Sequence, residues 1–183
     1  GQGVVGFDLA GGERGNPASL HAEAFRFARE HDMLCTCHAG EGAGAGAVRE
    51  AVHTCGVRRI GHATRLIEDP RLTDEIARAG VAIEACLTSN VQTRAVSDYA
   101  AHPLRAYFER GIRVTLNTDN RLMSATTLTA EYAHAANALH FTMDELCTLA
   151  LNGFESAFLP DDERRLLIDT VSPEFAALRA GAA

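Results

Sequence analysis

Residues 34–41 read Leu-Cys-Thr-Cys-His-Ala-Gly-Glu, a strand-like run that ends in polar side chains. Because successive side chains of a strand point to opposite faces, Thr36 and His38 share one face and the two cysteines share the other. Apolar residues at helical spacing follow over residues 47–55, and Gly56 suits the position just past a helix. The stretch therefore predicts one β-α unit with chemistry at the carboxyl end of its strand.

The same alternation of strand and helix recurs along the chain, and it predicts a parallel sheet covered by helices. Such a sheet is either doubly wound or part of a (β/α)8 barrel. The strands are expected at residues 4–9, 34–39, 58–63, 81–87 and 113–117. The helices are expected at residues 20–28, 47–55, 70–79, 103–111, 126–139, 142–151 and 161–169, with a fraying tail at residues 175–183.

The placement of polar residues distinguishes the two architectures. A barrel collects its functional side chains from the ends of several strands, whereas a doubly wound sheet concentrates them at one switch point. Polar residues lie at or just past the ends of five different strands: Asp8, His38, Glu41, His62, Ser89, Asn90, Asp119 and Asn120. The sequence therefore favours an α/β fold that is part of a (β/α)8, or TIM, barrel.

The number of strands bears on the domain organisation. A complete barrel has eight strands and takes ~250 residues, whereas the 183 residues here supply five strands. We therefore expect residues 1–183 to form one partial barrel domain, made of strands four to eight with their helices and a C-terminal helical extension, and truncated at its N-terminus. The alternative is a partial barrel that pairs with another chain through its open sheet edges.

Composition excludes several classes of function. The net charge of −7 offers no broad basic surface for nucleic acid, and no apolar run is long enough to span a membrane. All 17 basic residues are arginines, so the chain has no lysine for a Schiff base, for pyridoxal phosphate or for a P-loop. The five cysteines include no C-x-x-C pair, and no signal peptide is visible, so reduced thiols and a cytoplasmic location are expected.

A recurring set of metal-ligand residues indicates the chemistry. A single strand histidine such as His38 is more often structural than a metal ligand. However, Gly61-His62-Ala63 ends the third strand and Thr118-Asp119-Asn120 ends the fifth, so His, Asp and Glu recur at successive strand ends. This recurrence favours a metal-dependent active site over coincidence.

Six segments, in order, resemble the adenosine deaminase family. The resemblance covers roughly residues 4–169. The segments are Asp8-Leu9-Ala10-Gly11, His38-Ala39-Gly40-Glu41, Gly61-His62, Leu87-Thr88-Ser89-Asn90, Asn117-Thr118-Asp119-Asn120 and Asn152-Gly153-Phe154-Glu155-Ser156-Ala157-Phe158-Leu159-Pro160. The resemblance implies a bacterial-type, amidohydrolase-like barrel with one zinc ion per active site. It also implies hydrolysis of the 6-amino group of adenosine or 2′-deoxyadenosine, which yields inosine or 2′-deoxyinosine and ammonia in purine salvage.

The resemblance also implies roles for individual residues. His38 and Asp119 match zinc ligands of the family. Glu41 matches the proton donor to the purine N1, and His62 matches the histidine that orients and deprotonates the water at the metal. Gly11 matches the glycine whose backbone amide meets N3 of the purine.

The sequence departs from the family pattern at three points. The family's first strand carries a His-x-His pair of further zinc ligands, and no two histidines here are separated by one residue. Because catalytic zinc usually has at least three protein ligands, we expect the chain as written to be inactive. Asn120 stands where many members have a second aspartate that donates to N7 of the purine, and an asparagine amide can donate the same bond. Ala63 replaces a glycine, and its methyl group could tilt His62.

Two other functions stay open. A related aminohydrolase that acts on adenine, AMP or a modified nucleoside would share these motifs. A noncatalytic partial barrel would act as an interaction partner and need no metal. The H-x-E at residues 21–23 lacks the Pro-Cys-x-x-Cys of cytidine-type deaminases and is expected in a surface helix. The expected ligand is a small purine nucleoside, with neither nucleic acid nor membrane as partner, and the sequence does not set the oligomeric state.

Overall fold

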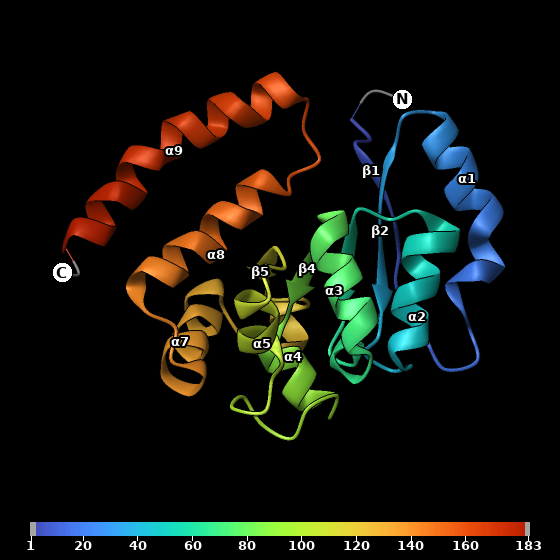
Figure 1. Cartoon of the computed structure of the whole chain (residues 1–183), viewed down its shortest axis with the longest axis horizontal. Coiled ribbons are helices and arrows are strands. Elements are labelled where there is room, and N and C mark those ends of the chain that lie inside the picture. The colour runs from blue at the N-terminus through green and yellow to red at the C-terminus, as the bar shows by residue number, and fades with distance from the viewer. Residues whose placement is uncertain (1–2, 182–183) are drawn as a thin grey trace.

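A computed structural model describes residues 3–181, whose strands form one five-stranded parallel sheet (Figure 1). The strands are β1 (Gly6–Leu9), β2 (Leu34–Ala39), β3 (Arg59–His62), β4 (Ala82–Ala85) and β5 (Val114–Leu116). They are neighbours in chain order, and all pairs are parallel. A doubly wound sheet would break this order at its switch point. The order therefore confirms the partial barrel.

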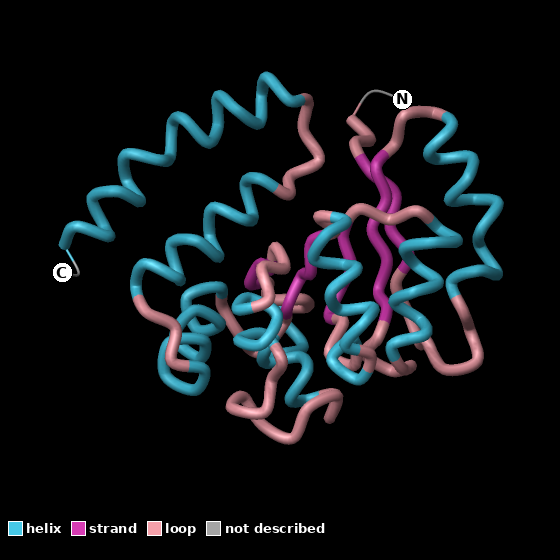
Figure 2. The backbone as a smooth tube through the Cα atoms, viewed as in Figure 1, coloured by secondary structure: helices cyan, strands magenta, loops and turns pink. Residues whose placement is uncertain are grey.

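Helices connect the strands and extend the chain beyond the sheet (Figure 2). The first three connections contain η1 (Ala18–His21) and α1 (Ala22–Glu30), then α2 (Ala45–Glu50) and the π-helical η2 (Ala51–Cys55), then η3 (Leu66–Glu68) and α3 (Pro70–Ala79). The fourth contains α4 (Leu87–Gln92) and α5 (Leu104–Glu109). After β5 come α6 (Arg121–Ser124), α7 (Leu128–Leu139), α8 (Met143–Glu155) and α9 (Asp161–Gly181).

Local capping signals determine where several helices begin and end. The Asp69 carboxylate accepts a hydrogen bond from the backbone N–H of Leu72 at 3.0 Å, which caps α3. Gly80 ends the same helix in the left-handed conformation, as Gly56 ends η2. Thr142 begins α8 with a complete capping box. These predicted boundaries are confirmed.

The structure differs from the prediction in three segments. Leu87, expected at the end of a strand, begins α4, and α6 was not expected at all. The predicted fraying tail is wrong, because α9 continues to Gly181; Ala182 and Ala183 lie outside the described residues. The reason is tertiary: the Arg179 guanidinium pairs with Asp144 of α8 at 2.7 Å, and α9 runs alongside α8 (Figure 1).

The core lies between the outer face of the sheet and the helices. In β2 the two cysteines are buried while Thr36 and His38 are half-buried, which confirms the predicted alternation. The buried core members include Val48, Ile60, Leu72, Ile76, Ile83, Leu104, Tyr107 and Val114. All five cysteines are free and buried, and burial raises the pKa of Cys37 to about 12. Such thiols are structural rather than reactive.

Polar side chains of the neighbouring strands β2, β3 and β4 meet across the sheet. Arg59 Nε lies 2.9 Å from the Glu84 carboxylate, which also accepts a hydrogen bond from Thr36 at 3.1 Å. The guanidinium of Arg59 stacks on the Phe158 ring, 3.6 Å from its centroid. A β-carbon at position 6 would lie 2.7 Å from the same ring, so Gly6 makes room for it. The segment after α8 thus closes the N-terminal end of the sheet.

Candidate active site

The candidate site lies at the carboxyl ends of the strands. His38 comes from β2, His62 ends β3, and Asp119 follows β5. All three line one cavity of about 510 Å³, together with Glu84 and Cys86. The structure therefore brings the two residues expected to bind zinc to the walls of one cavity.

The two histidine rings are in direct contact. Their centroids are 4.7 Å apart and the rings are nearly perpendicular, at 86°. Gly61 is the register partner of His38 on the neighbouring strand. A β-carbon on Gly61 would lie 2.7 Å from Cδ2 and 3.3 Å from Nε2 of His38. Glycine at this position therefore provides the space that the His38 ring occupies.

The backbone turns sharply at these strand ends. His62, Ala63 and Asp119 have positive φ angles of 67°, 50° and 53°, a conformation that costs a residue with a β-carbon about 1–2 kcal/mol. The buried Tyr107 hydroxyl donates to the carbonyl of Ala63 at 2.8 Å and so fixes the turn after His62. Strained backbone of this kind concentrates at functional sites.

Glu41 reaches the site from the loop after β2. Its Oε1 accepts hydrogen bonds from Asn90 Nδ2 at 2.7 Å and from the Thr93 hydroxyl at 2.9 Å. The same oxygen lies 3.7 Å from Nδ1 of His62. About a fifth of the Glu41 side chain, 21%, is exposed. The structure thus places Glu41 beside His62 with one oxygen fully engaged.

The loop that carries Glu41 is held by a carboxylate that sequence reasoning missed. Glu13 accepts the backbone N–H groups of Gly40 at 2.9 Å, Glu41 at 2.9 Å and Ala43 at 3.0 Å. The neighbouring Arg14 donates from Nε to the carbonyl of Gly42 at 2.9 Å. The signal was the position of Glu13, two residues after Gly11 in the loop that follows β1.

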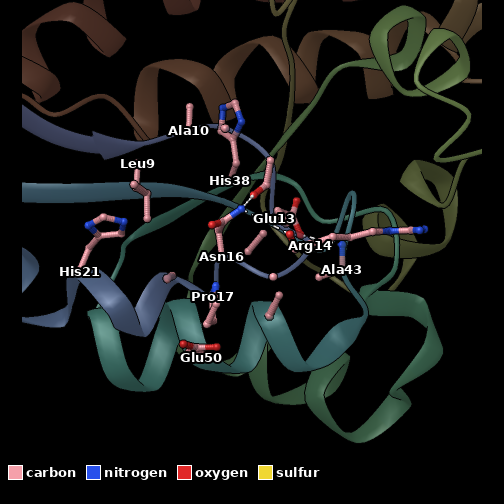
Figure 3. A pocket seen from close by; sticks show the side chains of 16 residues that line it. Leu9, Ala10, Glu13, Arg14, Asn16, Pro17, His21, His38, Ala43 and Glu50 are labelled. Carbon is pink, nitrogen blue, oxygen red and sulfur yellow. Dashed lines mark hydrogen bonds between the residues drawn. The ribbon is translucent and has the colours of Figure 1, made fainter.

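Gly11 lies in a second cavity, of about 480 Å³, that shares His38 with the first. Its φ of 135° suits glycine alone, and a β-carbon there would meet no atom within 4 Å. Figure 3 shows His38 on the opposite side of this cavity from Glu50 of α2. The backbone of Gly11 is therefore open to a ligand.

Asp119 and Asn120 are both exposed but differ in their contacts. Oδ2 of Asp119 accepts a hydrogen bond from the Ser89 hydroxyl at 2.7 Å. Asn120 caps α6, because its Oδ1 accepts the backbone N–H of Met123 at 3.0 Å. That bond leaves the Nδ2 hydrogens of Asn120 free to donate. Asp119 lines the 510 Å³ cavity, whereas Asn120 is not among its lining residues.

Two further polar residues of the site are Asn90 and His102, which are buried. Nδ2 of Asn90 lies 3.0 Å from Nδ1 of His62, and its Oδ1 lies 3.1 Å from Nε2 of His102. Burial lowers the pKa of His102 to about 3, with a smaller contribution from His62. The Leu-Thr-Ser-Asn segment hinted at Asn90, but nothing in the sequence marked His102.

The residues present include donor types that suit zinc. Imidazole nitrogen and carboxylate oxygen are the ligand types that zinc prefers, and Gly61 leaves the His38 ring its space. Burial lowers the pKa of His62, which favours the neutral imidazole. Among residues 3–181, however, no three His, Cys, Asp or Glu side chains are grouped so as to hold a metal ion. His38 and Asp119 therefore have the chemistry of zinc ligands, but two side chains are too few to hold the ion alone.

Comparison with known proteins identifies the family. Residues 1–174 match the family described as adenosine deaminase. The chain belongs to the adenosine deaminase family. It is 40% identical to an adenosine deaminase of Mycobacterium tuberculosis over 189 residues, which cover 97% of this chain and 52% of that protein. An adenosine deaminase of Aliivibrio fischeri is 39% identical, with 91% and 50% covered. The chain thus spans about half the length of the curated relatives that it matches.

Solved structures share the fold over nearly all of this chain. An adenine deaminase from Arthrobacter aurescens superposes with a TM-score of 0.87 at 31% identity, covering 92% of this chain and 52% of that one. A zinc-bound amidohydrolase from Burkholderia ambifaria gives 0.88 at 25% identity, with 96% and 49% covered. The N6-methyl-AMP deaminase of Arabidopsis thaliana gives 0.82 at 28% identity, with 94% and 51% covered.

Within residues 3–181, no helix is long and apolar enough to cross a membrane.

Proposed function

We propose that this chain contributes to a zinc-dependent deaminase that converts adenosine or 2′-deoxyadenosine into inosine or 2′-deoxyinosine and releases ammonia. The observation that carries the proposal is the convergence of His38, His62 and Asp119 on one cavity, with Glu41 beside His62. The family membership supports the reaction class. In a cell, such an enzyme would act in purine salvage in the cytoplasm.

His38 and Asp119 would hold the zinc ion together with ligands from outside these residues. A bound zinc ion acts as a Lewis acid and makes water nucleophilic at neutral pH. The Ser89 hydroxyl orients Asp119 by donating to its Oδ2, which leaves Oδ1 for the metal. The missing ligands would be a His-x-His pair, which this sequence does not contain.

Glu41 would protonate N1 of the purine. When oxygen adds to C6 of an aromatic ring, charge moves onto N1, and a positioned acid there typically contributes about 10²- to 10⁴-fold to the rate. Oε1 of Glu41 already accepts two hydrogen bonds, and none of the described residues donates to Oε2. The proton of the carboxylic acid therefore belongs on Oε2, from which it can be delivered.

The remaining contacts would orient the purine and the attacking water. The backbone N–H of Gly11 would donate to N3, in the cavity that Gly11 shares with His38. The free Nδ2 of Asn120 would donate to N7, since its Oδ1 is used to cap α6. His62 would hold the attacking water close to C6.

The proposal is tested in a longer protein. These 183 residues are joined to the part of the Mycobacterium tuberculosis relative that they do not cover, and we call the product the completed protein. Conversion of adenosine to inosine is followed with zinc and after chelation, and His38→Ala with Asp119→Ala serves as the inactive control. Zinc-dependent turnover supports the proposal. Zinc binding without turnover of adenosine contradicts the assignment of adenosine as the substrate.

A related substrate is the second candidate. The structural similarity to an adenine deaminase and to an N6-methyl-AMP deaminase favours it. Competition among adenosine, adenine and AMP in the completed protein ranks the three. Zinc analysis of the 183-residue chain addresses the noncatalytic alternative, which needs no metal. Stoichiometric, four-coordinate zinc in this chain alone would contradict the proposal that some of the zinc ligands come from outside these residues.

A further inference from the structure

A buried chain of hydrogen bonds connects the start of α5 to Glu41 and His62. The backbone N–H of Leu104 donates to Nδ1 of His102 at 3.1 Å. Nε2 of His102 lies 3.1 Å from Oδ1 of Asn90. Nδ2 of Asn90 in turn lies 2.7 Å from Oε1 of Glu41 and 3.0 Å from Nδ1 of His62. Asn90 is fully buried, at 0% exposure, and His102 is nearly so, at 3%.

The direction of every bond in this chain follows from its first donor. A backbone N–H can only donate, so Nδ1 of His102 must accept. A neutral imidazole has a single N–H, which then lies on Nε2 and donates to Oδ1 of Asn90. The orientation of the Asn90 amide is thereby fixed, and both of its Nδ2 hydrogens point to the site. One goes to Glu41 and the other to His62.

The direction of these hydrogen bonds determines which atoms of Glu41 and His62 stay available to a ligand. With Asn90 and Thr93 both donating to Oε1 of Glu41, the proton of the acid is directed to Oε2. Because Nδ1 of His62 accepts from Asn90, the neutral ring carries its hydrogen on Nε2. His62 can then orient a water molecule by donating from Nε2. Neither ring nitrogen has a free lone pair, so of the two roles that the resemblance implied for His62, orienting and deprotonating the water, this hydrogen-bond pattern keeps only the first.

We propose that Asn90 and His102 are positioning residues of the deaminase site, which fix the proton-bearing oxygen of Glu41 and the tautomer of His62. The inference rests on the proposed function for its catalytic consequence, but the tautomers themselves do not depend on it. The hydrogen bonds require His102 to be neutral, and this agrees with its pKa, which burial lowers to about 3. A purely structural pair would hold α4 to α5 without affecting either side chain.

The kinetic test compares four variants of the completed protein. Asn90→Asp keeps the size of the side chain but loses both donors, so kcat should fall about 10²-fold or more while KM changes little. His102→Leu should lower kcat in the same way, and His102→Gln should restore most of it, because its amide can still donate to Asn90. Asn152→Asp is the matched control, since this amide donates to the carbonyl of Val114 away from the site at 2.9 Å.

The second readout is spectroscopic and needs no turnover. Histidine ¹⁵N shifts in the 183-residue chain should show the hydrogen of both His62 and His102 on Nε2, and His102→Leu should change the His62 signals. A hydrogen on Nδ1 of His62, or wild-type kcat in both Asn90→Asp and His102→Leu, would overturn the inference. If the completed protein deaminates none of the three purines, the proposed function fails, while the ¹⁵N shifts still decide the tautomers.

Discussion

Strands β3 and β5 place left-handed backbone on different kinds of residue at their two ends. Before these strands the chain turns through Gly56 and Gly111. At their carboxyl ends the same conformation falls on His62, Ala63 and Asp119. Glycine adopts it with no steric penalty, whereas a β-carbon costs about 1–2 kcal/mol. At these two strands, the residues before the strand are thus suited to turning, and those after it are kept for their side chains.

The comparison predicts that a small change at the carboxyl end affects activity more than stability. Gly61→Ala places a methyl group 2.7 Å from Cδ2 of His38 and must displace that ring. Because a shift of about 1 Å can cost ~10²-fold in rate, we expect kcat/KM of the completed protein to fall at least that far, with loss of zinc measured by elemental analysis.

A matched glycine substitution serves as the control. Gly46 lies in α2, and a β-carbon there would meet no atom within 4 Å. Gly46→Ala should retain parental activity and zinc content. Equal activity in the two variants would show that the His38 ring does not need the space that Gly61 leaves.

In the body of the sheet, a change should lower stability. Arg59→Met removes the 2.9 Å ion pair with Glu84 and the stacking on Phe158, and it leaves Glu84 half-buried without its cation. We expect a loss of about 2 kcal/mol in unfolding free energy, measured by urea denaturation. Arg26→Met, in an exposed pair on α1, should have a much smaller effect. Equal losses in the two variants would contradict a stabilising role for the pair of Arg59 with Glu84.

The pH dependence of stability should sharpen the comparison further. The folded state holds the pKa of His102 at about 3, below the ordinary value of 6.5, because of burial. Below pH 6.5 the unfolded chain binds a proton that the folded protein does not, so stability is lost as the pH falls toward 3. For one proton the slope reaches about 1.4 kcal/mol per pH unit. His102→Gln should lack this contribution, and a flat difference between the two urea-derived stability curves from pH 7 to pH 4 would contradict it.

Local signals in the sequence were sufficient for the order of the sheet and for most helix ends. Asp69, Gly80 and Thr142 act within one turn of their own helices, so their roles were predictable from neighbouring residues. The strand-end position of His38 and Asp119 followed from the same local reasoning. Their roles as zinc ligands, and those of Gly11 and Asn120 in binding the purine, stay predictions.

Contacts between distant segments were not predictable. Glu13 meets the loop after β2 across 27 to 30 residues, and the length of α9 depends on its packing against α8. His102 precedes Pro103 in what looks like an ordinary helix start, and only the path of the segment between α4 and α5 brings it to Asn90. Such pairings depend on tertiary structure, which no local pattern encodes.

The central claim is that His38 and Asp119 share one zinc ion at the carboxyl end of the sheet. A crystal structure of the completed protein, with diffraction data collected at the zinc absorption edge, tests it most directly. We predict one anomalous peak within about 2.2 Å of a His38 ring nitrogen and an Asp119 carboxylate oxygen. A peak elsewhere, or none at saturating zinc, would contradict the claim.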